Sequence, residues 1–223
     1  MTRPHVLLSV AVSVDGYIDD DGAQRFPLSN AEDFDHVDRM RAESGAIMVG
    51  AATIRRDNPR LLVRQAHRRA ARVAAGRPEF PLKVTVTGSG DLDPARDFWH
   101  CGGGKLVYTA DSGADRARAV VGDLAEVVCL GPAVDFGALL DDLGGRGVDR
   151  LMVEGGGTVH TAFLAAGLAD EIRVAVAPML IGRERAPRFL NPAEFPGGPA
   201  RRFHLEEVTK LGDVAVLRYF PKR

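Results

Sequence analysis

The segment LMVEGGGTVHTAF (151–163) carries the pattern of a phosphate-binding turn. An apolar run ends at Glu154, three glycines follow, and a helix is expected to begin near Thr158. Such a helix presents free backbone N–H groups and the positive end of its dipole, while glycines let the backbone approach a ligand closely. The glycines are Gly155, Gly156 and Gly157. Because a strand, a turn and a helix also build any α/β crossover, the pattern alone leaves both interpretations open.

Two polar side chains flank these glycines. Glu154 lies at the carboxyl end of the expected strand, which is where ligands bind in open α/β sheets. Its carboxylate could instead cap the N–H groups of the following helix. For His160 we expect a place on the surface of that helix rather than a catalytic role.

A second polar segment, GAATIRRDNPRL (50–61), comes directly after the apolar run 46–49. Thr53 is expected to begin a short helix. Asp57 and the Asn58-Pro59 pair are expected to end it, because the residue before a proline disfavours the helical conformation. The polar groups of this segment therefore also gather at the carboxyl end of a strand.

Two arginines near this segment could bind one phosphate group together. Arg64 follows the segment, and Arg41 lies in the preceding expected helix. A guanidinium binds phosphate oxygens with two parallel hydrogen bonds, so two converging arginines would make a strong anion site. The alternative for each arginine is a solvated place on the surface.

Two shorter motifs also follow apolar runs. In TVTGSGDLDP (85–94), Thr87, Gly88 and Ser89 could line an adenosine ribose or its 2′-phosphate. In SVDGYI (13–18), the glycine would allow a ligand to approach the backbone, although an ordinary turn explains it equally well. Each motif is weak evidence by itself.

Other kinds of site are not indicated. The formal net charge is −1, so no overall positive field draws the chain to nucleic acid or to an anionic membrane. Cys101 and Cys129 form no CxxC pair and have no histidine at ligand spacing, so neither a metal site nor a disulfide framework is expected. The Walker, GxGxxG and GxSxG motifs are absent. No run approaches the ~20 apolar residues that cross a bilayer, and a cytoplasmic location is expected.

The elements that must position these motifs alternate between strands and helices along most of the chain. Strands are expected at 5–14, 46–49, 83–87, 105–109, 126–130 and 150–153. Helices are expected at 30–44, 112–124, 134–147 and 157–168. After residue 168 three strand-like runs follow, and the last two flank an LGD turn as an antiparallel hairpin. The sequence predicts an α/β fold with a central, mostly parallel sheet flanked by helices and an antiparallel C-terminal hairpin.

Residues 1–223 are expected to form a single domain, with an Arg-rich loop or insertion at about 65–81. For this segment we expect a solvated loop or a short helix. A nucleic-acid-binding patch is the less favoured alternative, because no aromatic side chains are interleaved with the arginines.

Taken together, four motifs resemble the reductase domain of bacterial riboflavin-biosynthesis enzymes and its free-standing archaeal and fungal relatives, which have a dihydrofolate-reductase-like fold. The motifs are, in chain order, SVDGYI, RAESGAIMVGAATIRRDNPRLLVR, VTGSGDLDP and LMVEGGGTVHTAFLAAGLADEIRVAVAPMLIG. The combination of GAxTIxxDNPxL with EGGG is specific, and each of the other two is weak alone. The resemblance extends over residues 13–182.

The resemblance implies an NADPH-dependent reductase that needs no metal. Its substrate would be a 5-phosphoribosylamino-pyrimidine, whose sugar opens to an imine and accepts a hydride at C1′ to give the ribitylamino product. A dihydrofolate or pterin reductase of the same fold is one alternative. A non-catalytic nucleotide-binding protein is another.

The resemblance also implies roles for individual residues. Asp57 and Glu154 are candidates for assisting proton transfer, although a bound water could do this instead. Substrate contacts are implied for Arg41, Leu61, Arg64 and Glu154, with the two arginines on the 5′-phosphate, so that the charge of the second polar segment would seat phosphorylated molecules. With the motif at 85–94 included, the cofactor-binding candidates are Thr53, Asp57, Thr87, Gly88, Ser89, Gly155, Gly156, Gly157, Thr158 and Val159.

Two features concern partners and departures from the family. Bacterial bifunctional relatives carry an upstream zinc deaminase domain, whereas this sequence has no HxE motif followed by PCxxC, so another protein is expected to deaminate the pyrimidine. Relatives also contact substrate between Asp19 and Ser29, where no role is transferred to a residue of this chain. The strand edges expected after residue 168 predict a homodimer.

Overall fold

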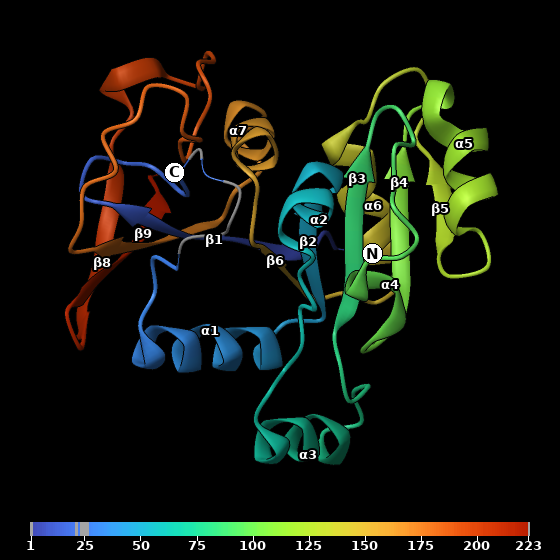
Figure 1. Cartoon of the computed structure of the whole chain (residues 1–223), viewed down its shortest axis with the longest axis horizontal. Coiled ribbons are helices and arrows are strands. Elements are labelled where there is room, and N and C mark those ends of the chain that lie inside the picture. The colour runs from blue at the N-terminus through green and yellow to red at the C-terminus, as the bar shows by residue number, and fades with distance from the viewer. Residues whose placement is uncertain (1, 21, 23–26, 223) are drawn as a thin grey trace. The chain divides into compact units, whose positions relative to one another are not determined.

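The computed structural model describes residues 2–20, 22 and 27–222 and divides into two compact units. Unit 1 comprises Met1–Pro4 and Asp38–Met152, and unit 2 comprises His5–Val37 and Val153–Arg223. Figure 1 shows the elements of both units.

Unit 1 is built on strands in the order β5-β4-β3-β2-β6. These strands are β2 (Ala46–Gly50), β3 (Leu82–Thr87), β4 (Lys105–Thr109), β5 (Glu126–Cys129) and β6 (Arg150–Val153, its last residue in unit 2). The pairs β2–β3, β3–β4 and β4–β5 are all parallel. Every residue of β2 is buried, as its continuous apolar sequence predicts for a strand covered on both faces.

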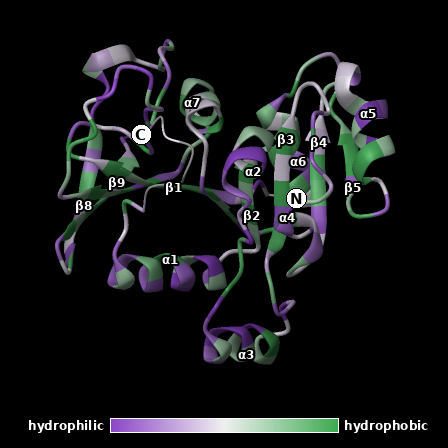
Figure 2. Cartoon of the chain, viewed as in Figure 1, coloured by the Kyte–Doolittle hydropathy of each residue, from purple (hydrophilic) through white to green (hydrophobic). Residues whose placement is uncertain are grey.

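Unit 1 also contains helices, which are α2 (Ala51–Asp57), α3 (Ala66–Ala74), α4 (Asp97–His100), α5 (Asp111–Val121) and α6 (Phe136–Gly145). Of these, α2 and α5 pack against the strands. Phe98 and Trp99 of α4 pack edge to face, with ring centroids 4.7 Å apart, inside a core cluster that includes Ile47, Ile54 and Val107. Figure 2 shows hydrophobic residues along the strands and mostly hydrophilic residues along α3.

The Arg-rich segment contains a short helix, α3, as expected, but one of its arginines is buried and not solvated. Arg72 is only 4% exposed, and its guanidinium donates to the carbonyl oxygens of Ala42 and Ser44, both at 2.7 Å, and of Pro78 at 2.9 Å. Burial lowers the pKa of Arg72. A buried cation is stable here because backbone carbonyls surround it.

Unit 2 has strands in the order β1-β7-β9-β8. β1 (His5–Ser13) is parallel to β7 (Glu171–Ala177), whereas β9 (Val214–Pro221) is antiparallel to β7 and to β8 (Phe203–Leu211). The C-terminal hairpin is therefore confirmed, with β8 at the end of the strand order. Unit 2 also contains α7 (Gly157–Ala165) and the short 3-10 helix η1 (Gly198–Ala200).

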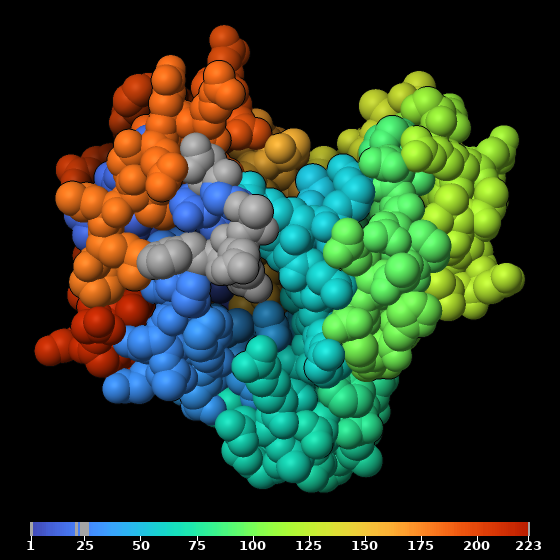
Figure 3. Space-filling model, in the orientation of Figure 1, coloured from blue at the N-terminus to red at the C-terminus, as the bar shows by residue number. Residues whose placement is uncertain are grey.

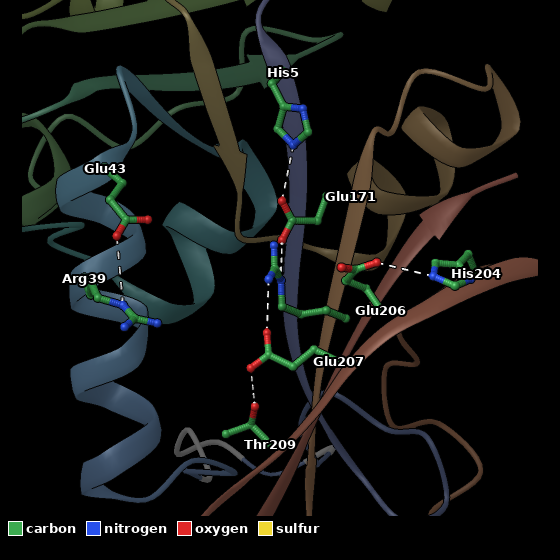
Figure 4. A network of polar contacts seen from close by, with 9 residues as sticks. His5, Arg39, Glu43, Glu171, His204, Glu206, Glu207 and Thr209 are labelled. Atoms are coloured by element: carbon green, nitrogen blue, oxygen red, sulfur yellow. Dashed lines mark hydrogen bonds and ion pairs between the residues drawn. The ribbon is translucent and has the colours of Figure 1, made fainter. Parts of the chain in front are cut away.

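A polar network ties the strands of unit 2 together (Figure 4). The buried carboxylate of Glu171 accepts from Arg218 at 2.9 Å and lies 3.2 Å from His5. Arg218 also donates to Glu207 at 3.1 Å, and Thr209 donates to Glu207 at 2.6 Å. These contacts connect β1, β7, β9 and β8 and so fix the register of the hairpin.

Helix α1 (Ala31–Glu43) begins in unit 2 and ends in unit 1. Asn30 caps it, since its side-chain oxygen accepts the N–H of Asp33 at 2.9 Å. Asp33 forms a hydrogen-bonded ion pair with Arg173 of β7, and both side chains are 1% exposed. Breaking such a buried pair on one side would strand a charge in the core.

The predicted α/β class, the parallel strands and the order of helices are confirmed, with ends that shift by a few residues. One start was wrong: α2 begins at Ala51 and not at Thr53, because the chain leaves β2 through an extended Gly50 and turns into the helix at once. In the part of the chain that the structure describes, no helix has the length and apolar character needed to span a membrane.

Candidate functional site

The second polar segment forms α2 and the turn that ends it, in unit 1. Ala51 and Ile54 are buried, so Thr53 and Asp57 lie half-buried on the rest of the helix surface. Asn58 ends the helix in the left-handed conformation, with φ 45°, and its N–H donates to Ile54 O at 3.1 Å. The carboxylate of Asp57 is thus held at the last helical position, where it is partly shielded from water.

Two arginines of this segment bind carboxylates of the protein itself. Arg55 donates to the backbone oxygen of Asp91 and lies 3.3 Å from its carboxylate, and Arg60 donates to Asp97 at 2.8 Å. These two guanidiniums are therefore engaged by the protein itself, and neither belongs to the predicted phosphate-binding residues, Arg41 and Arg64. Neither pair is visible in the sequence, because each joins residues more than 30 positions apart.

Arg64 and Arg41 differ from these pairs. Arg64 is exposed, and its guanidinium has no hydrogen-bond or ion-pair partner among the residues described. Arg41 is half-buried and donates to the backbone oxygen of Leu62 at 3.1 Å. Arg41 thus contacts the segment that carries Arg64, which brings the two predicted phosphate-binding residues into one part of unit 1.

Leu61 lies in the same segment with an unusual backbone. Its φ is 46°, and its side chain is 4% exposed and belongs to the core cluster of unit 1. Its side chain is therefore occupied by packing in the core of unit 1.

The loop after β3 carries Thr87, Gly88 and Ser89. Thr87 is buried and its hydroxyl accepts the N–H of Gly90 at 3.1 Å, which closes the turn. Gly88 and Ser89 are exposed. The loop packs against the start of α5, where Ser112 donates to Gly88 O at 3.1 Å. Gly88 and Ser89 are thus the members of this motif that are exposed to solvent.

The glycine-rich turn of unit 2 leads directly into α7. Its first helical residue, Gly157, leaves no room for a side chain, because a Cβ there would lie 2.6 Å from Arg188 O. Thr158 is exposed and Val159 is buried. The first turn of α7 contains no acidic residue, so the positive end of its dipole and its first N–H groups remain suited to an anion.

The SVDGYI turn (13–18) lies beside the glycine-rich turn in unit 2. Asp15 accepts hydrogen bonds from Ser13 at 2.5 Å and from the backbone N–H groups of Ile181 and Gly182, which together lower its pKa. Residues 188–189 contact both turns: Phe189 N–H donates to Gly16 O at 3.4 Å, and Arg188 O borders Gly157. The SVDGYI and EGGG motifs are thus neighbours within unit 2.

Arg188 was not identified from the sequence, because it lies in an irregular connection with no periodic signal. Its guanidinium donates to Tyr17 Oη at 2.8 Å and lies over the Tyr17 ring, 4.3 Å from the centroid. It adds an exposed positive charge beside the SVDGYI turn.

The prediction for His160 was wrong. Its side chain is 0% exposed, 5.3 Å from the Phe189 ring between centroids, and neither ring nitrogen has a hydrogen-bond partner among the residues described. Burial lowers its pKa to about 3, so the imidazole is neutral. The nearly all-round apolar sequence of α7 was the available signal, since a helix apolar on all sides is buried.

The predicted site residues fall into two sets. Arg41, Thr53, Asp57, Leu61, Arg64 and the 87–89 loop belong to unit 1, and the half-buried Glu154 with residues 155–159 belongs to unit 2. In unit 1, Thr53 and Asp57 follow β2 and the 87–89 loop ends β3; in unit 2, residues 154–159 follow β6. Part of the stretch between Asp19 and Ser29, namely 21 and 23–26, lies outside the described residues. Within the described ranges, no three His, Cys, Asp or Glu side chains are grouped to hold a metal ion.

The family model and the similar proteins of known name indicate the same protein family. The model of the RibD C-terminal domain matches residues 4–217. The chain is 35% identical to the 2,5-diamino-6-ribosylamino-4(3H)-pyrimidinone 5′-phosphate reductase of Archaeoglobus fulgidus, over 95% of each chain. It is 32% identical to the protein of the same name from Methanothermobacter thermautotrophicus, over 99% of each chain.

Solved structures agree at the level of the fold. A pyrimidine reductase-like protein from Corynebacterium diphtheriae superposes with a TM-score of 0.81 at 22% identity, over 99% of this chain and 92% of that one. RibD from Acinetobacter baumannii superposes with a TM-score of 0.80 at 26% identity, over 99% of this chain and 58% of that one.

Proposed function

Because this chain belongs to the RibD C-terminal domain family, we propose that it is an NADPH-dependent reductase of 2,5-diamino-6-ribosylamino-4(3H)-pyrimidinone 5′-phosphate in riboflavin biosynthesis or a related pathway. The observation that carries the proposal is the match over residues 4–217, which includes both polar segments. Three relatives at 30–35% identity have this substrate in their names, which favours the pyrimidine that has not been deaminated.

The first turn of α7 fits the pyrophosphate of a nicotinamide cofactor. Its N–H groups are uncompensated by an acidic side chain, and no side chain caps its N-terminus. In the proposal Gly155 to Val159 hold the phosphates through their backbone, and the exposed Gly88 and Ser89 with Thr87 line the adenosine end. Thr53 and Asp57 complete the cofactor contacts.

Arg64 and Arg41 hold the 5′-phosphate of the substrate in this proposal. Arg64 supplies an unengaged guanidinium, and Arg41 lies beside the same segment. The backbone at Leu61 and the carboxylate of Glu154 contact the rest of the substrate. Orientation of this kind can supply a large part of a rate enhancement, because it fixes the reacting carbon before the reaction begins.

NADPH, when bound, supplies the hydride that reduces C1′ of the opened sugar. The protein has to assist the step before it, in which the ribose ring opens as a proton reaches its ring oxygen and the C1′–N bond becomes an imine. Asp57 or Glu154 delivers this proton in the proposal, directly or through water. Both carboxylates are half-buried.

A turnover assay with the purified chain tests the function. NADPH oxidation is followed with the diamino-pyrimidinone phosphate, with its deaminated counterpart and with dihydrofolate, and each is repeated with NADH. We expect the fastest turnover with the diamino compound and NADPH. Turnover of dihydrofolate alone would instead indicate a folate reductase, and tight NADPH binding without any turnover would indicate a nucleotide-binding protein.

We also propose that the chain forms a homodimer in the cytoplasm. Support for the dimer comes from β8, which ends the strand order of unit 2 and exposes the apolar residues Phe203, Leu205 and Val208. An exposed apolar edge strand pairs readily with another chain unless it is covered.

A further inference from the structure

We propose that Asp38 is a positioning residue for the substrate phosphate: it fixes the backbone of Arg64 so that this arginine meets the 5′-phosphate. The inference rests on the proposed function, because it takes Arg64 as the phosphate-binding residue. It gives a role to the Arg-rich segment, which neither the motifs nor the reaction explains.

The carboxylate of Asp38 binds the start of the Arg-rich segment from α1. It accepts the backbone N–H of Arg64 on one oxygen, and on the other it accepts the N–H of Gln65 at 3.3 Å and Arg68 Nη1 at 2.9 Å. Asp38 is only 4% exposed. A buried carboxylate with three donors is a strong and directional anchor, because hydrogen bonds to a charged group are shorter and stronger than neutral ones.

Two further arginines hold the carbonyl groups of the same segment. Arg41 donates to Leu62 O at 3.1 Å. Arg69 donates to Val63 O at 3.1 Å and to Arg64 O at 2.6 Å, while its Nε donates to Glu79 at 2.9 Å. The backbone on both sides of Arg64 is therefore held by side chains from α1 and α3.

Helix α3 is itself anchored to the end of α1. Buried Arg72 bonds the carbonyl oxygens of Ala42 and Ser44, and Arg77 donates to Glu43 O at 2.9 Å. In Figure 3 the teal surface around α3 adjoins the cyan surface of the α2 region within unit 1. These arginines thus act mainly on the protein itself, whereas the guanidinium of Arg64 has no partner among the described residues and is left for a ligand.

The physical consequence concerns binding rather than bond making. Arg64 has a long, rotatable side chain, so its affinity for a phosphate depends on a backbone that is already in place; otherwise binding must order that backbone too. Loss of Asp38 should weaken binding of a phosphorylated substrate and leave the hydride step intact. It should have no effect on a substrate that lacks the phosphate.

Two variants test this with steady-state kinetics, Asp38→Ala and the isosteric Asp38→Asn. We expect Asp38→Ala to raise KM for the phosphorylated substrate about tenfold, with kcat within about twofold and KM for NADPH unchanged. Asp38→Asn retains one acceptor oxygen and should give a smaller rise in the same parameter. With the dephosphorylated nucleoside, both variants should match the wild type in kcat/KM.

Controls separate positioning from general stability. Asp149→Asn removes an exposed carboxylate that also binds an arginine of this region, Arg77, but does not touch residues 61–64, so its KM should equal that of the wild type. Thermal unfolding is measured for every variant. An Asp38→Asn protein that melts earlier but keeps the wild-type KM, or one that loses activity equally on both substrates, overturns the proposal.

A double-mutant cycle with Arg64→Ala distinguishes this inference from the function on which it rests. If Asp38 acts through Arg64, the double variant has the KM of Arg64→Ala alone; independent, multiplicative effects contradict the inference. If Arg64→Ala by itself leaves KM unchanged, the phosphate assignment in the proposed function fails. If Arg64→Ala raises KM and neither Asp38 variant does, only the role of Asp38 fails.

Discussion

Arg64 and Asp57 are only seven residues apart, yet their surroundings suit them to different tasks. Arg64 is exposed and unengaged within the described structure, as a residue that binds an anion from solvent must be. Asp57 is half-buried at the end of α2 and has a side chain 19% exposed. A shielded carboxylate is better suited to proton transfer than to simple attraction of charge.

We therefore expect substitution of Arg64 to change KM and substitution of Asp57 to change kcat. Arg64→Ala should raise KM for the phosphorylated substrate by tenfold or more, about the loss of one charge-assisted bidentate contact, with a small change in kcat. Asp57→Asn should lower kcat by about 10²-fold or more and leave substrate KM nearly unchanged. Steady-state kinetics measures both, and wild-type turnover in Asp57→Asn would remove Asp57 from the chemistry.

The burial of His160 predicts a specific dependence of stability on pH. Its pKa falls from 6.5 to about 3 on folding, so between these values the unfolded chain binds a proton that the folded chain does not. The contribution of His160 to the free energy of unfolding is therefore complete at pH values above the unfolded pKa of 6.5. It decreases by about 1.4 kcal/mol per pH unit as the pH falls toward the folded pKa.

Urea unfolding across this pH range checks the effect with two variants. His160→Leu should lose the contribution and show a shallower pH dependence than the wild type. His67→Leu, which removes an exposed histidine, should keep the wild-type slope. Equal slopes for His160→Leu and the wild type would show that His160 is protonated in the folded protein.

Helix α7 shows how one element can both complete the packing and present a binding surface. Its buried residues Val159, His160 and Phe163 face the interior of unit 2, while Gly157 lets residues 188–189 approach its first turn. Thr161 secures this approach, since its hydroxyl accepts the N–H of Asn191 at 2.9 Å. The anion-binding end of the helix is thus held by a loop from elsewhere in the unit.

Gly157→Ala should disturb this end of the helix. The added Cβ would meet Arg188 O, so either the loop or the first turn has to move, at a cost of about 1–3 kcal/mol in the free energy of unfolding. We expect NADPH to bind at least about tenfold more weakly as the N–H groups shift. Cofactor titration and thermal unfolding measure the two effects.

Gly145→Ala serves as the matched control, because a Cβ at this helical glycine in unit 1 meets nothing within 4 Å. It should preserve NADPH affinity and stabilise the helix slightly, by up to about 1 kcal/mol. Unchanged cofactor affinity in Gly157→Ala would show that the first turn of α7 does not hold the cofactor.

At the scale of the whole molecule, the exposed apolar residues of β8 predict association between chains. Light scattering should give twice the chain mass of 23.9 kDa, or about 48 kDa. The substitutions Leu205→Glu and Val208→Glu should shift the protein toward the monomer, because a buried unpaired carboxylate at an interface is costly. Val73→Glu places the same charge at an exposed apolar position of α3 and should leave the mass unchanged. A wild-type particle of about 24 kDa would contradict the dimer.

The sequence by itself determined those features that depend on neighbouring residues. The alternation of apolar runs with helical patterns predicted the strands and most helices, and local chemistry predicted the end of α2 at Asn58. Periodicity and capping are properties of short stretches, so they can be read without knowing the fold. The family resemblance added the candidate residues, which the local patterns alone left open.

Only the tertiary structure decided which partner each polar side chain has. It paired Arg55 and Arg60 with Asp91 and Asp97, buried His160, and placed Asp38 against the backbone of Arg64, 26 residues away. An arginine or aspartate has the same sequence signal whether it faces water, a ligand or another side chain. The choice among these is made by contacts between distant segments, which no local pattern records.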